Sequence, residues 1–119
     1  MGIYRIYKGE DDKSHIEELP LHDPFWKSVR TAATLFFKEF PPGTFLDWHP
    51  APRRQIVIIL SGRLEHTFRD GSRHTFAAGD IRILVDTTGE GHTTRVLGDE
   101  AVLVAVVPLA EVDAPGAGV

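Results

Sequence analysis

The sequence has no cysteine. The chain therefore forms no disulfide bond and no thiolate-ligated zinc site, and it has no cysteine nucleophile. A metal ion in this protein would have to bind histidine, aspartate, glutamate, glutamine or water. Any chemistry must come from imidazole, carboxylate, amide, hydroxyl or basic groups.

Long hydrophobic runs and concentrated positive charge are also absent. The longest apolar run, AVLVAVV at residues 101–107, is much shorter than the roughly 20 residues that span a bilayer. The N-terminal stretch MGIYRIYKGEDDKSH lacks the apolar region of a signal peptide. The net charge is −4, and Arg53–Arg54 is the only adjacent pair of basic residues, which does not suit a nucleic-acid surface. We expect a cytoplasmic protein without a membrane or nucleic-acid partner.

Helical patterning is scarce, and short β-rich runs separated by turn signals dominate the chain. This arrangement is typical of a sandwich or barrel. Residues 23–30 are the best helix candidate and better suit an irregular crossover. Asp70–Gly71 predicts a type I′ hairpin turn. The expected strands cover residues 3–7, 31–40, 55–60, 63–70, 72–76, 81–85, 92–96 and 101–109.

The length and composition indicate one domain over residues 1–119. A chain of 119 residues that is 42% hydrophobic can form one hydrophobic core without disulfide bonds or a structural metal ion. Residues 1–30 are expected to form N-terminal strands and a crossover, and residues 110–119 a loose tail. About nine strands in such a chain predict an all-β jelly roll or small barrel, mainly antiparallel.

The segment GTFLDWHPAPRRQIVIILSG, residues 43–62, resembles the first motif of the cupin superfamily, G-x5-H-x-H-x3,4-E-x6-G. Gly43, His49 and Gly62 match that motif, whereas Ala51 stands at the second histidine position and Gln55 at the glutamate position. The glycine frame is therefore present, but two of the three ligand positions are not.

The segment AAGDIRILVDTTGEGH, residues 77–92, resembles the second cupin motif. Gly79 and Asp80 form its turn, Ala77 replaces the usual proline, and His92 is the late histidine. The resemblance covers roughly residues 40–108 and implies a double-stranded β-helix. More narrowly, WHPAPRRQ at residues 48–55 and DTTGEGH at residues 86–92 look like a group of small single-domain bacterial cupins. Cupins of this kind commonly dimerise through N-terminal strands. We therefore expect a homodimer in which the strand at residues 3–7 pairs with its partner and protects an exposed edge.

Strand alternation predicts which side chains face the barrel interior. Residues two apart share a face of a strand, so His49, Arg53 and Gln55 are expected to point inward. His92 and Thr94 would enter from the opposing strand. These five residues would form a pocket with Val57 and Ile59 as its floor.

One hypothesis for this pocket is a divalent metal site. His49, His92 and Gln55 form a weak donor set, because an amide oxygen is a poorer ligand than a carboxylate. His66 would improve the site as a third imidazole, since it shares an inward face with Leu64 and Phe68. The ion would be zinc, iron, manganese or nickel. Alternatively, His66 is a hydrogen-bonded core histidine, and Gln55 satisfies a buried backbone group.

The other hypothesis is an anion pocket with acid–base chemistry. An inward Arg53 would bind a carboxylate or phosphate, and His49 and His92 would exchange protons. Asp86 or Glu90, on the loop before His92, would orient its imidazole. This chemistry resembles the metal-independent cupin sugar epimerases and isomerases. The aromatic residues expected to line the mouth of the pocket are Phe45, Trp48 and Phe68.

Three functions follow from these alternatives. We favour a small-molecule-binding cupin that acts as an acid–base isomerase, epimerase or lyase on a small organic acid or polar metabolite, because Ala51 and Gln55 weaken a metal site twice. The first alternative is a metal-dependent dioxygenase or lyase. The second alternative is a non-catalytic ligand-binding protein.

Overall fold

The structure is a computed structural model that describes residues 1–20 and 34–109. The expected crossover at 23–30, the start of the strand expected at 31–40 and the C-terminal tail lie outside these residues. The described part contains no helix with the length and hydropathy needed to cross a membrane. Its strands are β1 (Ile3–Lys8), β2 (Ser14–Glu18), β3 (Phe36–Phe40), β4 (Phe45–His49), β5 (Gln55–Ser61), β6 (Arg63–Thr67), β7 (Arg73–Phe76), β8 (Ile81–Leu84), β9 (His92–Leu97) and β10 (Val102–Pro108).

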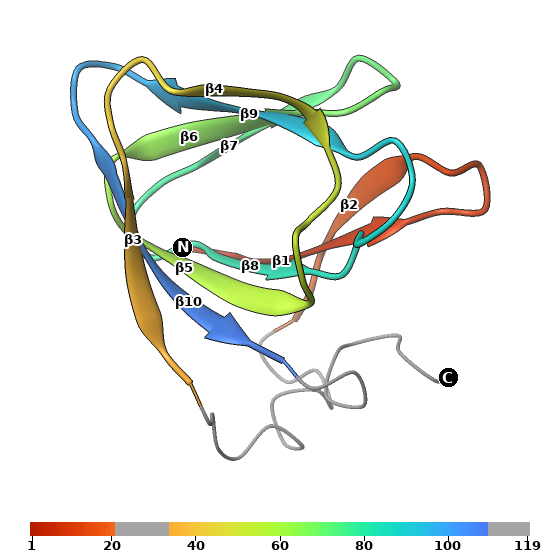
Figure 1. The fold of residues 1–119 in the computed structure, drawn as a ribbon, viewed down its shortest axis with the longest axis horizontal. Helices are drawn as coiled ribbons and strands as arrows, with labels where there is room; N and C mark the ends of the chain where they lie inside the picture. Colours follow the sequence, from red (N-terminus) through yellow and green to blue (C-terminus); the bar gives the residue numbers. More distant parts are fainter. Residues whose placement is uncertain (21–33, 110–119) are drawn as a thin grey trace.

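The strands form two sheets that face each other across the barrel (Figure 1). One sheet has the order β2-β1-β8-β5-β10-β3, and the other has the order β4-β9-β6-β7. All pairings are antiparallel except that between β1 and β8. The all-β jelly roll predicted from the sequence is confirmed.

The continuous apolar run of strand β5 packs against a different hydrophobic cluster on each face. Val57 and Ile59 belong to the core between the sheets, whereas Ile56 packs with Ile83 in a second cluster. Alternate side chains point to opposite faces of a strand, so both faces of β5 are buried over this stretch. The burial ends at Leu60, which is 42% exposed.

Strand β2 was not located among the N-terminal strands expected in residues 1–30, because its sequence SHIEE offers only Ile16 as an apolar residue. It pairs antiparallel with β1 from Tyr4 opposite Glu18 to Lys8 opposite Ser14. Strand β1 is therefore flanked by β2 and β8. The prediction that β1 has a free edge for a partner subunit is wrong, because a weakly apolar segment of the same chain already pairs with that edge.

The hairpin at Asp70–Gly71 forms, but its turn differs from the type I′ expectation. Gly71 has a φ of 88°, whereas Asp70 is not among the residues with positive φ. The backbone N–H of Gly71 donates to the carbonyl of Phe68, and that of Phe68 donates to the carbonyl of Ser72. Asp70 also accepts a hydrogen bond from the backbone N–H of Ser72 at 2.8 Å. These contacts suit the longer loop in which a glycine follows the turn in the left-handed region.

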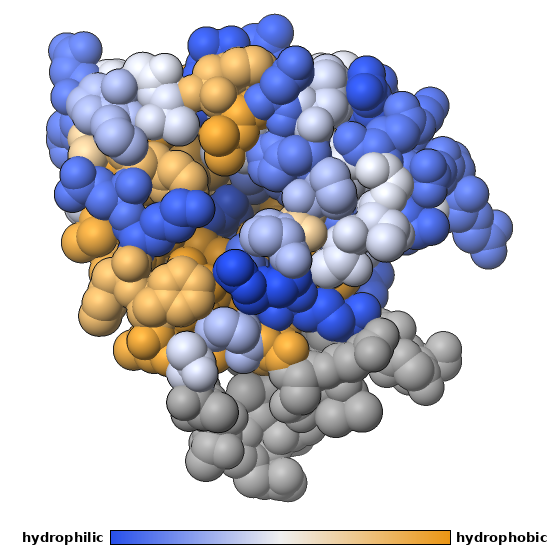
Figure 2. All heavy atoms as spheres, in the orientation of Figure 1, coloured by the Kyte–Doolittle hydropathy of each residue, from blue (hydrophilic) through white to orange (hydrophobic). Residues whose placement is uncertain are grey.

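Part of the surface of the molecule is apolar. Figure 2 shows apolar surface around β3, interrupted by hydrophilic side chains, and mostly hydrophilic side chains on the side of β2. Leu35 and Phe37 are exposed on the apolar side. The polar groups of chemical interest instead lie in the cavity between the sheets.

Candidate functional site

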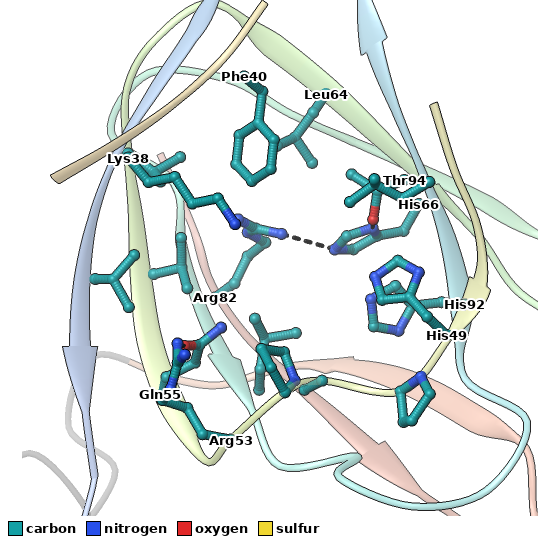
Figure 3. Close-up of a pocket in the computed structure, with 18 of the residues that line it drawn as sticks. Lys38, Phe40, His49, Arg53, Gln55, Leu64, His66, Arg82, His92 and Thr94 are labelled. Atoms are coloured by element: carbon teal, nitrogen blue, oxygen red, sulfur yellow. Dashed lines mark hydrogen bonds between the residues drawn. The ribbon is translucent and has the colours of Figure 1, made fainter. Parts of the chain in front are cut away.

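A cavity of about 340 Å³ opens between the two sheets (Figure 3). His49, His66 and His92 come from the four-stranded sheet, while Gln55 and Arg82 come from the facing six-stranded sheet. The lining residues are Phe36, Lys38, Phe40, Leu46, His49, Pro50, Ala51, Pro52, Arg53, Gln55, Val57, Leu64, His66, Arg82, Leu84, His92, Thr94, Val104 and Val106. The predicted pocket residues His49, Arg53, Gln55, His66, His92 and Thr94 are all in this set.

The predicted aromatic wall does not line the cavity. Trp48 lies beneath the guanidinium of Arg69 at 3.8 Å, and Phe45 lies beneath Arg95 at 4.6 Å. Phe68 is buried in the core, with its ring centroid 6.2 Å from that of His66. Phe36 and Phe40 of β3 line the cavity instead.

For Phe45 and Trp48, the reason is an irregularity in β4. The pairing of β4 with β9 shifts register between Leu46 and His49, so Leu46 lies opposite Thr94 and His49 opposite His92. Leu46 and His49 therefore both line the cavity although they are three residues apart. Simple two-residue alternation fails here because a bulge adds a residue to one strand.

His92 is held by a buried carboxylate. Its Nδ1–H donates to Oδ2 of Asp86 at 2.7 Å, and the hydroxyl of Ser14 donates to the same oxygen at 2.5 Å. Asp86 is 0% exposed. A carboxylate that accepts from Nδ1 fixes the proton there and leaves the Nε2 lone pair of the neutral ring free. Glu90, the other predicted orienting residue, pairs instead with Arg69 at 3.3 Å.

His49 lies beside His92 and has the same tautomer. Its Nδ1–H donates to the carbonyl of Asp47 at 2.6 Å, so its Nε2 also carries a lone pair. The ring centroids of His49 and His92 are 5.0 Å apart. Two imidazole nitrogens able to accept a proton therefore lie close together in the cavity.

Arg82 is a site residue that the sequence analysis missed. Its side chain is buried, and its Nη1 donates to Nε2 of His66 at 2.8 Å, the contact drawn as a dashed line in Figure 3. The residue lies in an otherwise apolar strand, IRIL, two positions before the inward Leu84. An arginine on the inward face of such a strand is the signal that would have identified it.

His66 is a neutral hydrogen-bond relay. Because an arginine only donates, Nε2 of His66 accepts and its proton lies on Nδ1. That Nδ1–H donates to the carbonyl of Thr93 at 3.1 Å, and the Thr94 hydroxyl lies 3.2 Å from the same nitrogen. Burial is the main reason that the pKa of His66 lies well below its usual value, and electrostatic interaction with the neighbouring His92 and Arg82 lowers it further.

Arg53 and Gln55 form a pair at the rim of the cavity. Nη1 of Arg53 donates to Oε1 of Gln55 at 2.9 Å. Gln55 is buried, whereas Arg53 is exposed, and the Arg53 guanidinium lies 5.6 Å from the Phe36 ring. Gln55 therefore satisfies a side chain rather than the backbone group that the sequence suggested.

The residues present do not fit a metal centre. Within residues 1–20 and 34–109, no group of three or more histidines or acidic residues is arranged to hold a metal ion. Nε2 of His66 accepts from Arg82, and Oε1 of Gln55 accepts from Arg53. Only Nε2 of His49 and Nε2 of His92 are left, whereas catalytic zinc sites use three protein ligands. The three-imidazole site suggested by the sequence is thus replaced by a cationic pocket.

The neutral, buried His66 predicts a loss of stability in mild acid. The unfolded chain binds a proton at an ordinary histidine pKa near 6.5 that the folded chain does not bind. The free energy of unfolding should therefore fall as the pH decreases below about 6.5, by at most about 1.4 kcal/mol per pH unit for one proton. Urea denaturation at a series of pH values measures this slope.

Two variants separate His66 from the other histidines. In His66→Gln, the free energy of unfolding should depend less on pH, by the contribution of about one proton. In His15→Gln the dependence should be unchanged, because His15 is paired with Asp11 outside the cavity. Equal slopes in the wild type and His66→Gln would contradict this prediction, because they would mean that His66 binds a proton equally well in the folded and unfolded protein.

Comparisons with known proteins identify a family and several similar structures. A family model described as a cupin domain matches residues 36–108. A cupin 2 conserved barrel domain protein from Salinispora arenicola is 28% identical and has a TM-score of 0.50, with 71% of this chain and 70% of that chain covered. A protein with a double-stranded β-helix domain from Klebsiella pneumoniae is 24% identical with a TM-score of 0.47, covering 76% of this chain and 79% of its own. A search of curated proteins finds no match.

Proposed function

This chain belongs to the cupin domain family, and from that premise we propose that its barrel binds a small organic acid and transfers a proton to and from it through His92. The observation that carries the proposal is the buried His92–Asp86 pair, joined at 2.7 Å, beside a cavity whose permanently charged lining is cationic. A cupin barrel that binds a small molecule is the broader function, and the proton transfer is its more specific form.

The charge of the cavity supports an anionic ligand. Lys38, Arg53 and Arg82 line it, and no aspartate or glutamate is among the described lining residues. Asp86 lies behind His92 rather than in the lining. Cationic walls attract an anion and stabilise negative charge that develops on it.

The His92–Asp86 pair supports proton transfer. Nε2 of His92 can take a proton from a carbon next to a carboxylate, while Asp86 keeps the ring oriented and stabilises the imidazolium that forms. Return of the proton at another position is an isomerisation, and departure of a neighbouring group is an elimination. His49 offers a second imidazole within 5.0 Å, between ring centroids, for the opposite step.

Deuterium exchange tests this function directly. The full chain is incubated in D2O with a panel of small hydroxy, keto and dicarboxylic acids, and NMR follows the loss of carbon-bound protons. We expect exchange with at least one acid that binds. His92→Gln should slow that exchange at least about 100-fold while binding persists, and Asp86→Asn should slow it because the ring loses its orienting partner. His15→Gln is the matched control, since His15 also contacts a carboxylate, Asp11, at 2.9 Å.

Each outcome separates the candidate functions. Acids that bind the wild type without any exchange would favour a non-catalytic binding protein. Activity that a chelator removes and a metal ion alone restores would favour the metal-dependent dioxygenase or lyase. If no acid binds, the proposal is wrong.

A further inference from the structure

We propose that Arg82, positioned by His66, is the anion anchor of the pocket, and that the ligand group it binds is a carboxylate held deep against the six-stranded sheet. This inference rests on the proposed function and deepens it. It assigns the anchoring role to Arg82 instead of Arg53, the residue that the sequence favoured.

The first observation is that Arg82 is a buried cation with an unused donor. It is 4% exposed and lines the cavity. The hydrogen bond from its Nη1 goes to His66, and its Nε–H has no hydrogen-bond partner among the described residues. Buried charges in proteins are ordinarily paired. An anion in the cavity would supply this guanidinium with both an opposite charge and a hydrogen-bond acceptor.

The second observation is that the described protein supplies no carboxylate to Arg82 at hydrogen-bond distance. Asp86 is the acidic group whose field reaches Arg82, but its Oδ2 already accepts from His92 and Ser14. Burial lowers the pKa of Arg82 to about 10, so the guanidinium remains charged at neutral pH. A permanent positive charge therefore faces the cavity.

The third observation is that Arg82 is held in place. His66 accepts from Nη1 while its own Nδ1–H donates to the carbonyl of Thr93. The ring of Phe76 lies 5.5 Å from the guanidinium carbon and 5.2 Å, between centroids, from the ring of His66. His66 is neutral and adds no charge, so it acts as a positioning residue. An anchor that is already oriented loses little freedom when it binds.

Arg53 lacks these properties. It is exposed at the rim and already donates to Gln55. A solvent-exposed cation contributes less to binding because water and salt screen its charge. Arg53 therefore draws an anion toward the opening, whereas Arg82 holds it beside His92.

A carboxylate fits this anchor better than a phosphate dianion. Arg82 carries one positive charge, and Asp86 lies close enough to act on it. A single negative charge balances the guanidinium, whereas a second one would be repelled by the buried Asp86 carboxylate. Phosphate and carboxylate share the chemistry that guanidinium recognises, so the experiment includes both.

The test is a binding titration of the full chain followed by NMR, with acetate, propionate and inorganic phosphate as probes and acetamide as an uncharged control. The Nε–H signal of Arg82 is assigned by its absence in Arg82→Lys. We expect the two carboxylates to shift this signal and acetamide to leave it unchanged. Arg82→Gln should weaken propionate binding at least 10-fold, whereas the matched rim variant Arg53→Gln should weaken it less than 3-fold. Thermal unfolding of each variant shows whether it is folded.

Several results would overturn the anchor. Propionate binding that is unchanged in Arg82→Gln, or lost equally in Arg53→Gln, would assign the anion to the rim. Phosphate that binds more tightly than both carboxylates would exclude the carboxylate. If Arg82→Gln does not fold, the wild-type titration still tests the proposal, because a carboxylate bound to Arg82 must shift its Nε–H signal. Tight carboxylate binding at Arg82 without proton exchange would contradict the proposed function alone, and exchange that survives in folded Arg82→Gln would contradict the anchor alone.

Discussion

Replacing Gly91 with alanine should destabilise the protein by more than about 3 kcal/mol or prevent it from folding. Gly91 has a φ of 74°, and a Cβ atom at this position would overlap the backbone carbonyl of His49. The substitution therefore combines an unfavourable backbone conformation with a clash against main-chain atoms that cannot rotate away. It would also separate His49 from His92, which lie opposite each other in the ladder between β4 and β9.

Gly71→Ala is the control for this prediction. Gly71 has a φ of 88°, but nothing lies within 4 Å of the Cβ that alanine would add. Its cost should be only the left-handed conformation itself, about 1–2 kcal/mol. Urea denaturation of the two variants measures the difference. Equal stabilities would mean that the backbones at Gly91 and His49 do not approach as closely as this structure indicates.

Phe76→Ala should destabilise the protein by about 3–5 kcal/mol, because it leaves a cavity in a packed core. Phe76 is 0% exposed. Its ring packs edge-on against Tyr4 and His66, at centroid distances of 5.5 Å and 5.2 Å. The loss would also remove the wall beneath Arg82, whose guanidinium carbon lies 5.5 Å from this ring. Propionate binding should therefore weaken together with stability.

Phe37→Ala provides the matched control, since the same side chain is removed from a site that is 64% exposed. We expect a change within about 1 kcal/mol and unaltered propionate binding. Both variants are compared by urea denaturation and by the same NMR titration. A similar cost at the two positions would contradict the packing described for Phe76.

The strands and the frame of the site could be predicted because their signals are local. The apolar run from Gln55 to Leu60 predicts a strand from neighbouring residues alone, and it forms β5. The Asp70–Gly71 pair predicts a hairpin in the same way, and it joins the paired strands β6 and β7. The spacing from Gly43 to Gly62 identified the family that the comparison confirms. The inward set containing His49, His66 and His92 followed from alternation along strands.

The contents of the site could not be predicted in the same way, because they depend on contacts between distant segments. Ser14 reaches Asp86 from 72 positions away, and it does so on a strand too polar to be recognised alone. Arg82 contacts His66 only because β8 and β6 lie in facing sheets. Because of the bulge in β4, Leu46 lines the cavity, whereas the expected Phe45 and Trp48 do not.

The sequence by itself determined an all-β chain with a glycine frame and a set of inward histidines, since turns and alternation are properties of a few consecutive residues. Only the tertiary structure decided what those histidines do. The packing of the two sheets brought the guanidinium of Arg82 to His66, and the fold of the loop before β9 placed Asp86, rather than Glu90, against His92. The proton position on each ring, and with it the choice between a metal ligand and a hydrogen-bonding group, is set by the partner that the fold brings to the other nitrogen.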